Sequence, residues 1–358
     1  MYLIVVYHIV VHCVVGQMYG SVYSRPQMFS ELYLIQALMP LGMMANDIFI
    51  MISGYFLVEK GKDIKLGNVA KKLMIQLGAA ALFLTFGSLL FFFVSHRFDY
   101  IFARLIDIRY FNDDVWFVGY YFAVIVVAAL FLNKRLNEME QKPYTALLLA
   151  LLAFTSFMWS GGVLNSLAQE LRTLAGGVFL YALGGYIKRF DPFAKIRGWV
   201  LAVLPLLVLG INLLSFFNNI QTELKNYDIY YNIQVESGAE INSFHQSVIG
   251  FANYNLIVIV LAVTVFELFR RLKMPNSKVI NFIGGGTFMI YILHDNVLWY
   301  DIWGSYPWMD ILSTSLPVFC LQLLKWSVIV FAVCLLGYVV YRLLALLCVK
   351  CKGLVLRE

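Results

Sequence analysis

About ten long apolar runs, separated by short polar connections, divide this chain of 358 residues. A helix of about 20 apolar residues, rising about 1.5 Å per residue, crosses a hydrocarbon core about 30 Å thick. We therefore expect an all-α, polytopic integral membrane protein with about ten transmembrane helices in one bundle. The runs are Met1 to Gly16, Leu34 to Val58, Val69 to Val94, Val115 to Leu132, Tyr144 to Trp159, Leu171 to Ile187, Trp199 to Phe217, Val248 to Phe269, Val279 to Tyr300 and Leu316 to Leu347.

The composition excludes a water-soluble enzyme. Hydrophobic residues make up 61% of the chain and charged residues only 13%, whereas charged residues make up about a quarter of a typical soluble domain. Three of the five cysteines lie inside apolar runs, so no disulfide framework is predicted. Neither a repeat nor a long linker divides the sequence. We expect one transmembrane domain over residues 1–350, followed by a short cytoplasmic tail over residues 351–358.

The positions of the basic residues indicate the orientation of the helices, because cytoplasmic loops are enriched in Lys and Arg. Most of the 27 basic residues fall in alternate connections and in the tail, so we expect a multi-pass protein of the plasma membrane with both termini in the cytoplasm. Their spread over several short loops excludes a nucleic-acid-binding patch. These residues are Lys60, Lys62, Lys65, Lys71, Lys72, Lys134, Arg135, Lys142, Lys188, Arg189, Lys195, Arg197, Arg270, Arg271, Lys273, Lys278, Arg342, Lys350, Lys352 and Arg357.

The longest outward connection is expected to run from Asn218 to Ser247. It is acidic and rich in Tyr and Asn. Aromatic faces stack on sugar rings and amides bind hydroxyl groups, so this segment would suit a carbohydrate. The other interpretation is an ordinary solvated loop with tyrosines anchored at the membrane interface.

Ionisable side chains inside the apolar runs are candidate site residues, because lipid makes them energetically expensive. His8 and His12 stand four residues apart, which places them on one face of the first helix. The segment from His294 to Asn296 interrupts the ninth run, and the Asn46-Asp47 pair interrupts the second. Counted along their helices, His8 and His294 share a level in the outer half of the bundle, whereas Asp47 lies deeper.

Acyl transfer to a hydroxyl group is the chemistry that suits this set of residues. A neutral imidazole, with an ordinary pKa of about 6.5, can take a proton from an alcohol while a carboxylate fixes its tautomer. Histidines satisfied by backbone carbonyls are the structural alternative. A zinc site built from His8, His12 and His294 is possible by ligand count, but no Cys or carboxylate spacing supports it.

Two further features have simple structural interpretations. Gly284 to Gly286 could suggest a phosphate-binding loop, but no lysine follows, and close helix packing explains them better. Glu267 stands near a helix end, where a charged side chain is expected to reach the interface.

Four segments, taken together and in this order, resemble the membrane acyltransferase-3 family. The closest likeness is to the Gram-positive branch that O-acetylates surface polysaccharides, with which Asn133 and the segment Tyr181 to Ile187 also agree. The similarity covers nearly the whole chain. The four segments are His8 to His12, Asn46 to Leu57, Trp116 to Tyr121 and Thr287 to Asn296.

The resemblance implies acetyl-CoA as the acyl donor and a hydroxyl group of a polysaccharide or lipid-linked glycan as the acceptor. His8 matches the catalytic histidine proposed for the family, acting as a general base or as a transient acyl acceptor. His12 or Asp47 would hold His8, and His294 with Tyr291 would stabilise the developing oxyanion or position the thioester. The motif residues expected to bind substrate are Asn46, Ser53, Trp116, Tyr121, Asp295 and Asn296.

The sequence departs from the family pattern at two places. The family carries an Arg ahead of the catalytic His, at a position that would precede Met1, so we expect either a reading frame that starts upstream or a chain that lacks this Arg. Lys71 and Lys72 represent the basic cluster that opens the family's third helix, with Ile75 and Gln76 where further arginines are common. We expect the two lysines to bind the phosphates of CoA, and we expect no metal. The expected partners are the glycan acceptor and membrane lipids.

Two alternatives from other functional classes stay open at this point. A transporter or flippase for polysaccharides or small molecules would also keep polar groups at mid-membrane, although no duplicated halves are visible in the sequence. A non-catalytic scaffold of a capsule-assembly complex is the third interpretation.

Overall fold

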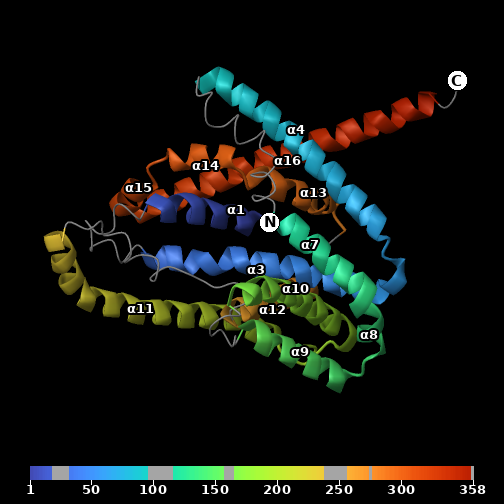
Figure 1. Cartoon of the computed structure of the whole chain (residues 1–358), viewed down its shortest axis with the longest axis horizontal. Helices are drawn as coiled ribbons and strands as arrows, with labels where there is room; N and C mark the ends of the chain where they lie inside the picture. The colour runs from blue at the N-terminus through green and yellow to red at the C-terminus, as the bar shows by residue number, and fades with distance from the viewer. Residues whose placement is uncertain (18–31, 96–115, 157–164, 238–255, 274–275, 356–358) are drawn as a thin grey trace. The chain divides into compact units, whose positions relative to one another are not determined.

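The computed structural model describes residues 1–17, 32–95, 116–156, 165–237, 256–273 and 276–355, and nearly all of these residues are helical (Figure 1). No strand occurs among them, which confirms the predicted all-α class. The chain divides into two compact units. The first unit comprises Met1–Val14, Gly67–Val118 and Met274–Glu358, and the second comprises Val15–Leu66 and Gly119–Lys273.

The first unit is built around the long C-terminal helix α16. The N-terminal helix α1 and helix α13 both pack on α16, and the π-helix η1 that continues α1 contacts α14 and α15 (Figure 1). A hydrogen bond of 2.6 Å between Tyr2 Oη and Ser327 Oγ ties α1 to α16. The elements are α1 (Tyr2–Ile9), η1 (Val10–Val14), α4 (Leu66–Ser95), α13 (Lys278–His294), α14 (Val297–Gly304), α15 (Trp308–Thr314) and α16 (Leu316–Val355).

The second unit is built around helix α3. Helix α10 packs along α3, α9 packs on α10, and α11 and α12 contact both α3 and each other. The elements are α3 (Leu32–Leu57), the 3-10 helix η3 (Val58–Asp63), α7 (Trp116–Val127, whose first three residues belong to the first unit), the π-helix η4 (Ala128–Leu132), α8 (Asn133–Glu138), α9 (Gln141–Ser156), α10 (Asn165–Phe190), α11 (Gly198–Ser237) and α12 (Leu256–Arg271).

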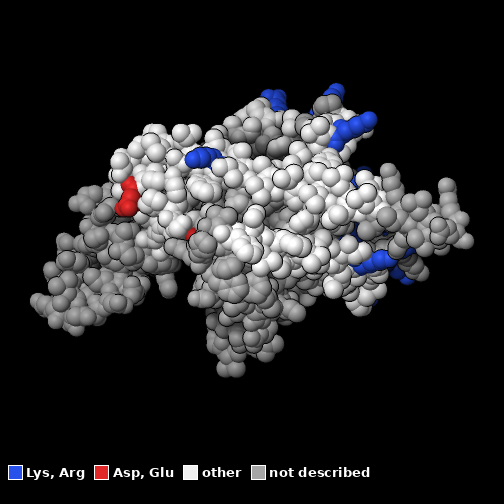
Figure 2. Space-filling model, turned by 90° about the horizontal axis from the view of Figure 1, so that it is seen from above, with Lys and Arg blue, Asp and Glu red and all other residues white. Residues whose placement is uncertain are grey.

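Five helices in the described part of the chain are long and apolar enough to cross a membrane, and a shorter apolar helix covers Tyr2–Gln17. Large hydrophobic side chains such as Phe86 and Leu206 are each 68% exposed, as expected for a surface that contacts lipid tails rather than water. Figure 2 shows a described surface on which charged side chains are few. The chain is therefore a membrane protein. The five spans are Leu32–Lys60, Leu66–Leu90, Trp116–Glu138, Gly198–Asn219 and Leu316–Leu347.

The described residues of the other expected runs are mostly helical, but these helices do not meet this length and hydropathy requirement, so the predicted number of about ten transmembrane helices is not established. The expected loop from Asn218 onward is wrong as far as Ser237, because α11 continues as a helix to that residue. Residues 238–247 of that connection lie outside the described residues. Asn46 and Asp47 interrupt the apolar run but not the helix, since α3 continues through both to Leu57.

A close approach of two backbones holds α3 against α10. A Cβ atom added at Gly54 would lie 1.9 Å from the carbonyl oxygen of Tyr181, and one added at Gly184 would lie 2.1 Å from the carbonyl oxygen of Met51. Small residues at such crossings allow the close contact on which helix association in membranes depends. Both glycines belong to segments that resemble the acyltransferase-3 family.

We expect Gly184→Ala to lower the free energy of unfolding by about 3 kcal/mol or more, because its methyl group would have to push two helix backbones apart. The measurement is the thermal stability of the purified protein in detergent, followed by size-exclusion chromatography after heating. Gly210→Ala in α11 is the matched control, since a Cβ atom there meets nothing within 4 Å, and it should leave stability unchanged or slightly raised. Equal melting temperatures for both variants would contradict this account of the crossing.

Glu267 differs from its expected role at the membrane interface. Its side chain is fully buried, with Arg270 Nε 2.7 Å from Oε2 and Arg271 Nε 2.6 Å from Oε1. Arg271 also donates to the carbonyl oxygens of Phe193 and Ile196, so it joins α12 to the connection between α10 and α11. The prediction that Glu267 reaches the interface is therefore wrong, because two arginines neutralise the carboxylate in place.

Candidate active site

Helix α1 and its continuation η1 carry the first two site histidines. His8 lies at the end of α1 and is buried, while His12 lies in η1 and is exposed. Their ring centroids are 5.3 Å apart and the ring planes are nearly perpendicular, at 84°. The predicted placement of both histidines on one face is therefore confirmed.

A break between α13 and α14 presents the other half of the site. Helix α13 ends at His294, and Asn296 caps α14 by accepting from the backbone N–H groups of Leu298 and Trp299. The Asn296 amide also donates to the carbonyl oxygen of Leu293 at 2.7 Å. These bonds satisfy backbone groups that a broken helix would otherwise leave unpaired. The structure thus gives Asn296, expected to bind substrate, a role in shaping the break.

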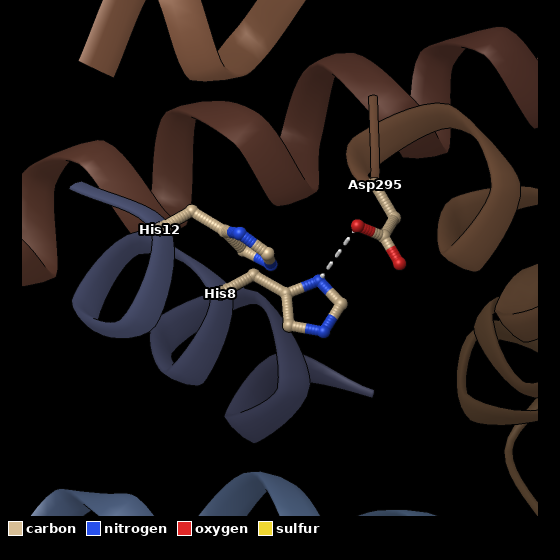
Figure 3. A group of neighbouring side chains, drawn as sticks. All are labelled: His8, His12 and Asp295. Carbon is tan, nitrogen blue, oxygen red and sulfur yellow. Dashed lines mark ion pairs between the residues drawn. The ribbon is translucent and has the colours of Figure 1, made fainter. Parts of the chain in front are cut away.

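His8 of α1 lies beside Asp295, which stands in the break between α13 and α14, and both residues belong to the first unit. His8 Nδ1 lies 3.2 Å from Asp295 Oδ1, and the two side chains are only 11% and 7% exposed (Figure 3). The rings of His8 and His294 stack, with centroids 4.9 Å apart and an interplanar angle of 18°. His8 Nδ1 makes no hydrogen bond among the described residues, but a carboxylate can only accept, so its position favours the tautomer with the proton on Nδ1 and the lone pair on Nε2.

His294 is fixed in one tautomer by the backbone. Its Nδ1 lies 2.9 Å from the carbonyl oxygen of Ile290, and because a carbonyl oxygen only accepts, Nδ1 must be the protonated nitrogen. Nε2 is then an acceptor, and it is buried with no hydrogen-bond partner among the described residues. Tyr291 packs next to it, with ring centroids 5.9 Å apart. A buried lone pair without a donor is a position where a substrate hydroxyl can bind.

Tyr300 completes the surroundings of Asp295 and was not predicted from the sequence. Its hydroxyl donates to Asp295 Oδ1, and its ring stacks on His12 with centroids 4.3 Å apart. Asp295 itself was expected only to bind substrate, yet it is the carboxylate that contacts His8. Its position beside His294, at the level predicted for His8, is the sequence signal that could have identified this pairing.

Four of the predicted site residues belong to the second unit. Asp47 is buried, and neither its Oδ2 nor the Oδ1 of Asn46 has a hydrogen-bond partner among the described residues. Ser53 Oγ donates to the carbonyl oxygen of Phe49 at 3.2 Å and lies 3.5 Å from the hydroxyl of Tyr121. The structure therefore brings together two residues, Ser53 and Tyr121, that were predicted separately as substrate-binding residues. The predicted contact of Asp47 with His8 stays a prediction.

A basic pocket in the first unit contains one of the two lysines expected to bind CoA. The pocket has a volume of about 350 Å³, and its basic side chains are Lys72 from α4 and Arg342 from α16. Tyr338 and Tyr341 also line it, with their rings stacked 6.3 Å apart. Lys71 is exposed on the same helix without lining the pocket. Arg342 and the tyrosines line this pocket but were not predicted from the sequence, where only their spacing on one helix face indicates them.

Two glycines on α13 allow the side chain of Tyr338, which lines the pocket, to pack closely against that helix. A Cβ atom added at Gly286 would lie 2.7 Å from Tyr338 Cδ1, and one at Gly285 would lie 2.9 Å from its hydroxyl oxygen. The interpretation of these glycines as helix-packing residues is therefore confirmed for Gly285 and Gly286.

Trp116, predicted to bind substrate, lies at the start of α7, is 47% exposed and packs edge-on against Phe117. Phe117 in turn contacts Tyr291, at 5.3 Å between centroids.

Comparison with known families matches the sequence of the chain to one of them. A family model for the acyltransferase-3 domain, described as an acyltransferase domain, matches residues 1–342. The matched region contains α1, the break between α13 and α14, and the basic pocket's lining residues except Ala345 and Leu346. Neither the curated proteins nor the solved structures contain a match to the chain.

Proposed function

Because the chain belongs to the membrane acyltransferase-3 family and is therefore a membrane acyltransferase, we propose that it transfers an acetyl group from acetyl-CoA to a hydroxyl group of a cell-surface or exported polysaccharide. The contact of 3.2 Å between His8 Nδ1 and Asp295 Oδ1 is the observation that carries this proposal. Membership of an enzyme family argues against the transporter, flippase and scaffold alternatives. The distribution of basic residues supports a plasma-membrane protein with both termini in the cytoplasm.

His8 acts as the general base in this mechanism. Asp295 holds the proton of Nδ1, so Nε2 takes the proton of the acceptor hydroxyl as its oxygen attacks the thioester carbonyl carbon. The tetrahedral intermediate then collapses, the C–S bond breaks, and the imidazolium returns its proton to the CoA sulfur. A transient acetyl group on His8 itself is the alternative route, in which CoA leaves before the hydroxyl arrives.

His294 and Tyr291 position the substrate in this proposal. Since the Nε2 lone pair of His294 accepts hydrogen bonds, it suits the acceptor hydroxyl better than an oxyanion, which needs a donor. His12, exposed at the edge of the site, would contact the glycan. Asn46, Ser53 and Tyr121 remain proposed to contribute to substrate binding, as their family motifs imply, and Asp47 remains proposed as a residue that holds His8.

The basic pocket supports acetyl-CoA as the donor. Lys72 and Arg342 place two positive charges on one cavity, as a molecule with several phosphate groups requires. The stacked Tyr338 and Tyr341 offer aromatic faces to an adenine base. Lys71, exposed one residue away, would add a third positive charge at the entrance.

Arg342→Ala is expected to raise the KM for acetyl-CoA by about tenfold, because one charge-assisted hydrogen bond to phosphate is lost. The kcat at saturating donor should change much less. Initial rates at varied acetyl-CoA concentration in isolated membranes give both values. Arg197→Ala, an exposed basic residue before α11, is the matched control and should keep the wild-type KM. Equal KM values for the two variants would contradict the assignment of this pocket.

The function as a whole is tested with membranes that contain the protein, labelled acetyl-CoA and a deacetylated polysaccharide. We expect label on the polysaccharide, released by mild alkali as an O-acetyl ester, and an equal amount of free CoA. Hydrolysis of acetyl-CoA that the polysaccharide does not stimulate would contradict the proposed acceptor.

A further inference from the structure

Three potential metal ligands converge in the first unit. One nitrogen each of His8 and His12 and one carboxylate oxygen of Asp295 lie within 4.8 Å of one another (Figure 3). We propose that these three side chains form a binding site for Zn²⁺, and that an ion bound there inhibits acetyl transfer.

The ligand types and their spacing fit this ion. Zinc takes imidazole nitrogen and carboxylate oxygen at about 2.0–2.2 Å, which places tetrahedral ligand atoms roughly 3.3 Å apart. His8 Nδ1 and Asp295 Oδ1 already have a separation of 3.2 Å. The His12 side chain is exposed, so a rotation about its side-chain bonds can close the remaining distance. Three protein ligands also leave the fourth position of a tetrahedral ion open to water.

Burial and outer contacts favour the site as well. His8 and Asp295 are nearly buried while His12 is exposed, so an ion can enter past His12 and then lose most of its water. The hydroxyl of Tyr300 donates to Asp295, the kind of outer contact that orients a metal-bound carboxylate. Asp295 supplies the carboxylate that the sequence-based zinc hypothesis lacked. It takes the place of His294, which is not one of the three residues whose ligand atoms converge.

Inhibition follows from competition for the same groups. A metal bound to Nδ1 of His8 displaces the proton from that nitrogen, so the remaining ring proton lies on Nε2 and Nε2 can no longer take the proton of the hydroxyl. A carboxylate bound to the ion also no longer favours a proton on Nδ1. This consequence rests on the proposed role of His8 in acetyl transfer, whereas binding of the ion does not.

The binding experiment uses full-length protein purified in detergent and stripped with a chelator. Zn²⁺ is titrated by calorimetry, and Co²⁺ is followed by its visible absorption. We expect one ion per wild-type chain and binding at least 10- to 100-fold weaker in His12→Ala, since loss even of an outer-shell group costs that much. Tyr2→Phe, on the same helix but outside the site, should bind like wild type. No saturable binding, or equal binding by wild type and His12→Ala, would overturn the site.

The inhibition experiment is separate. Each variant's acetyl transfer with added Zn²⁺ is divided by its own rate with chelator, so that any effect of the substitution on catalysis cancels. We expect Zn²⁺ to inhibit wild type at concentrations at least 10-fold lower than for His12→Ala. Equal sensitivity of the two would overturn the inhibitory role. Zinc binding without any acetyl transfer by wild type would support the metal site and contradict the proposed function.

Discussion

Replacing His8 with alanine is expected to reduce acetyl transfer to the polysaccharide by about 10³-fold, because the hydroxyl would lose the base that takes its proton. The rate is measured in isolated membranes at saturating acetyl-CoA and is normalised to the amount of protein by immunoblot. The loss should appear in kcat rather than in the KM for acetyl-CoA, since the basic pocket of Lys72 and Arg342 is untouched.

Tyr2→Phe is the matched control for this prediction. It removes the hydrogen bond between α1 and α16 and so perturbs the same helix, but it leaves the imidazole in place. We expect Tyr2→Phe to keep most of the wild-type rate. If His8→Ala retained the wild-type rate at normal expression, His8 could be neither base nor acyl acceptor. If both variants lost activity equally, the effect of His8→Ala would come from the packing of α1.

Asp295→Asn is expected to lower kcat by about 10²-fold to 10⁴-fold while leaving the protein folded. The amide has nearly the shape of the carboxylate but lacks the charge that stabilises the imidazolium and holds the Nδ1 proton. His8 can then adopt the tautomer in which Nε2 carries the proton and cannot act as a base. The measurement is the same membrane assay at saturating donor and acceptor.

Tyr300→Phe separates the effect of the Asp295 charge on kcat from the effect of the hydrogen bond that Asp295 accepts. It removes one hydrogen bond to the Asp295 carboxylate without changing that charge, so we expect a loss of about tenfold at most. An effect as large as that of Asp295→Asn would contradict the pairing of His8 with Asp295 as the catalytic unit.

Local features of the fold followed from the sequence. The apolar runs predicted helices, and the positions of His8 and His12 four residues apart predicted one helix face, because both depend on helical periodicity alone. The interruption of the ninth apolar run at His294 to Asn296 indicated the place where α13 ends. The continuation of α11 to Ser237 was missed because polar Tyr and Asn residues near a membrane surface are equally compatible with a loop.

The pairing of side chains between helices could not be predicted. His8 and Asp295 lie at opposite ends of the chain, and only packing on α16 brings α1 and α13 to the same place. Asp47 was predicted to hold His8 although it lies deeper by helix counting, because one sequence does not show which helices touch. The burial of Glu267, in contrast, had a visible signal, because Arg270 and Arg271 follow it by three and four residues and can contact it within one helix.

The most direct test of the central claim compares purified wild-type protein with His8→Ala in CoA release from acetyl-CoA, with and without the polysaccharide. The proposed mechanism predicts that wild-type protein releases CoA only when the acceptor is present, with one acetyl ester formed for each CoA, and that His8→Ala does neither at a measurable rate. Acceptor-dependent release by His8→Ala at the wild-type rate would contradict it.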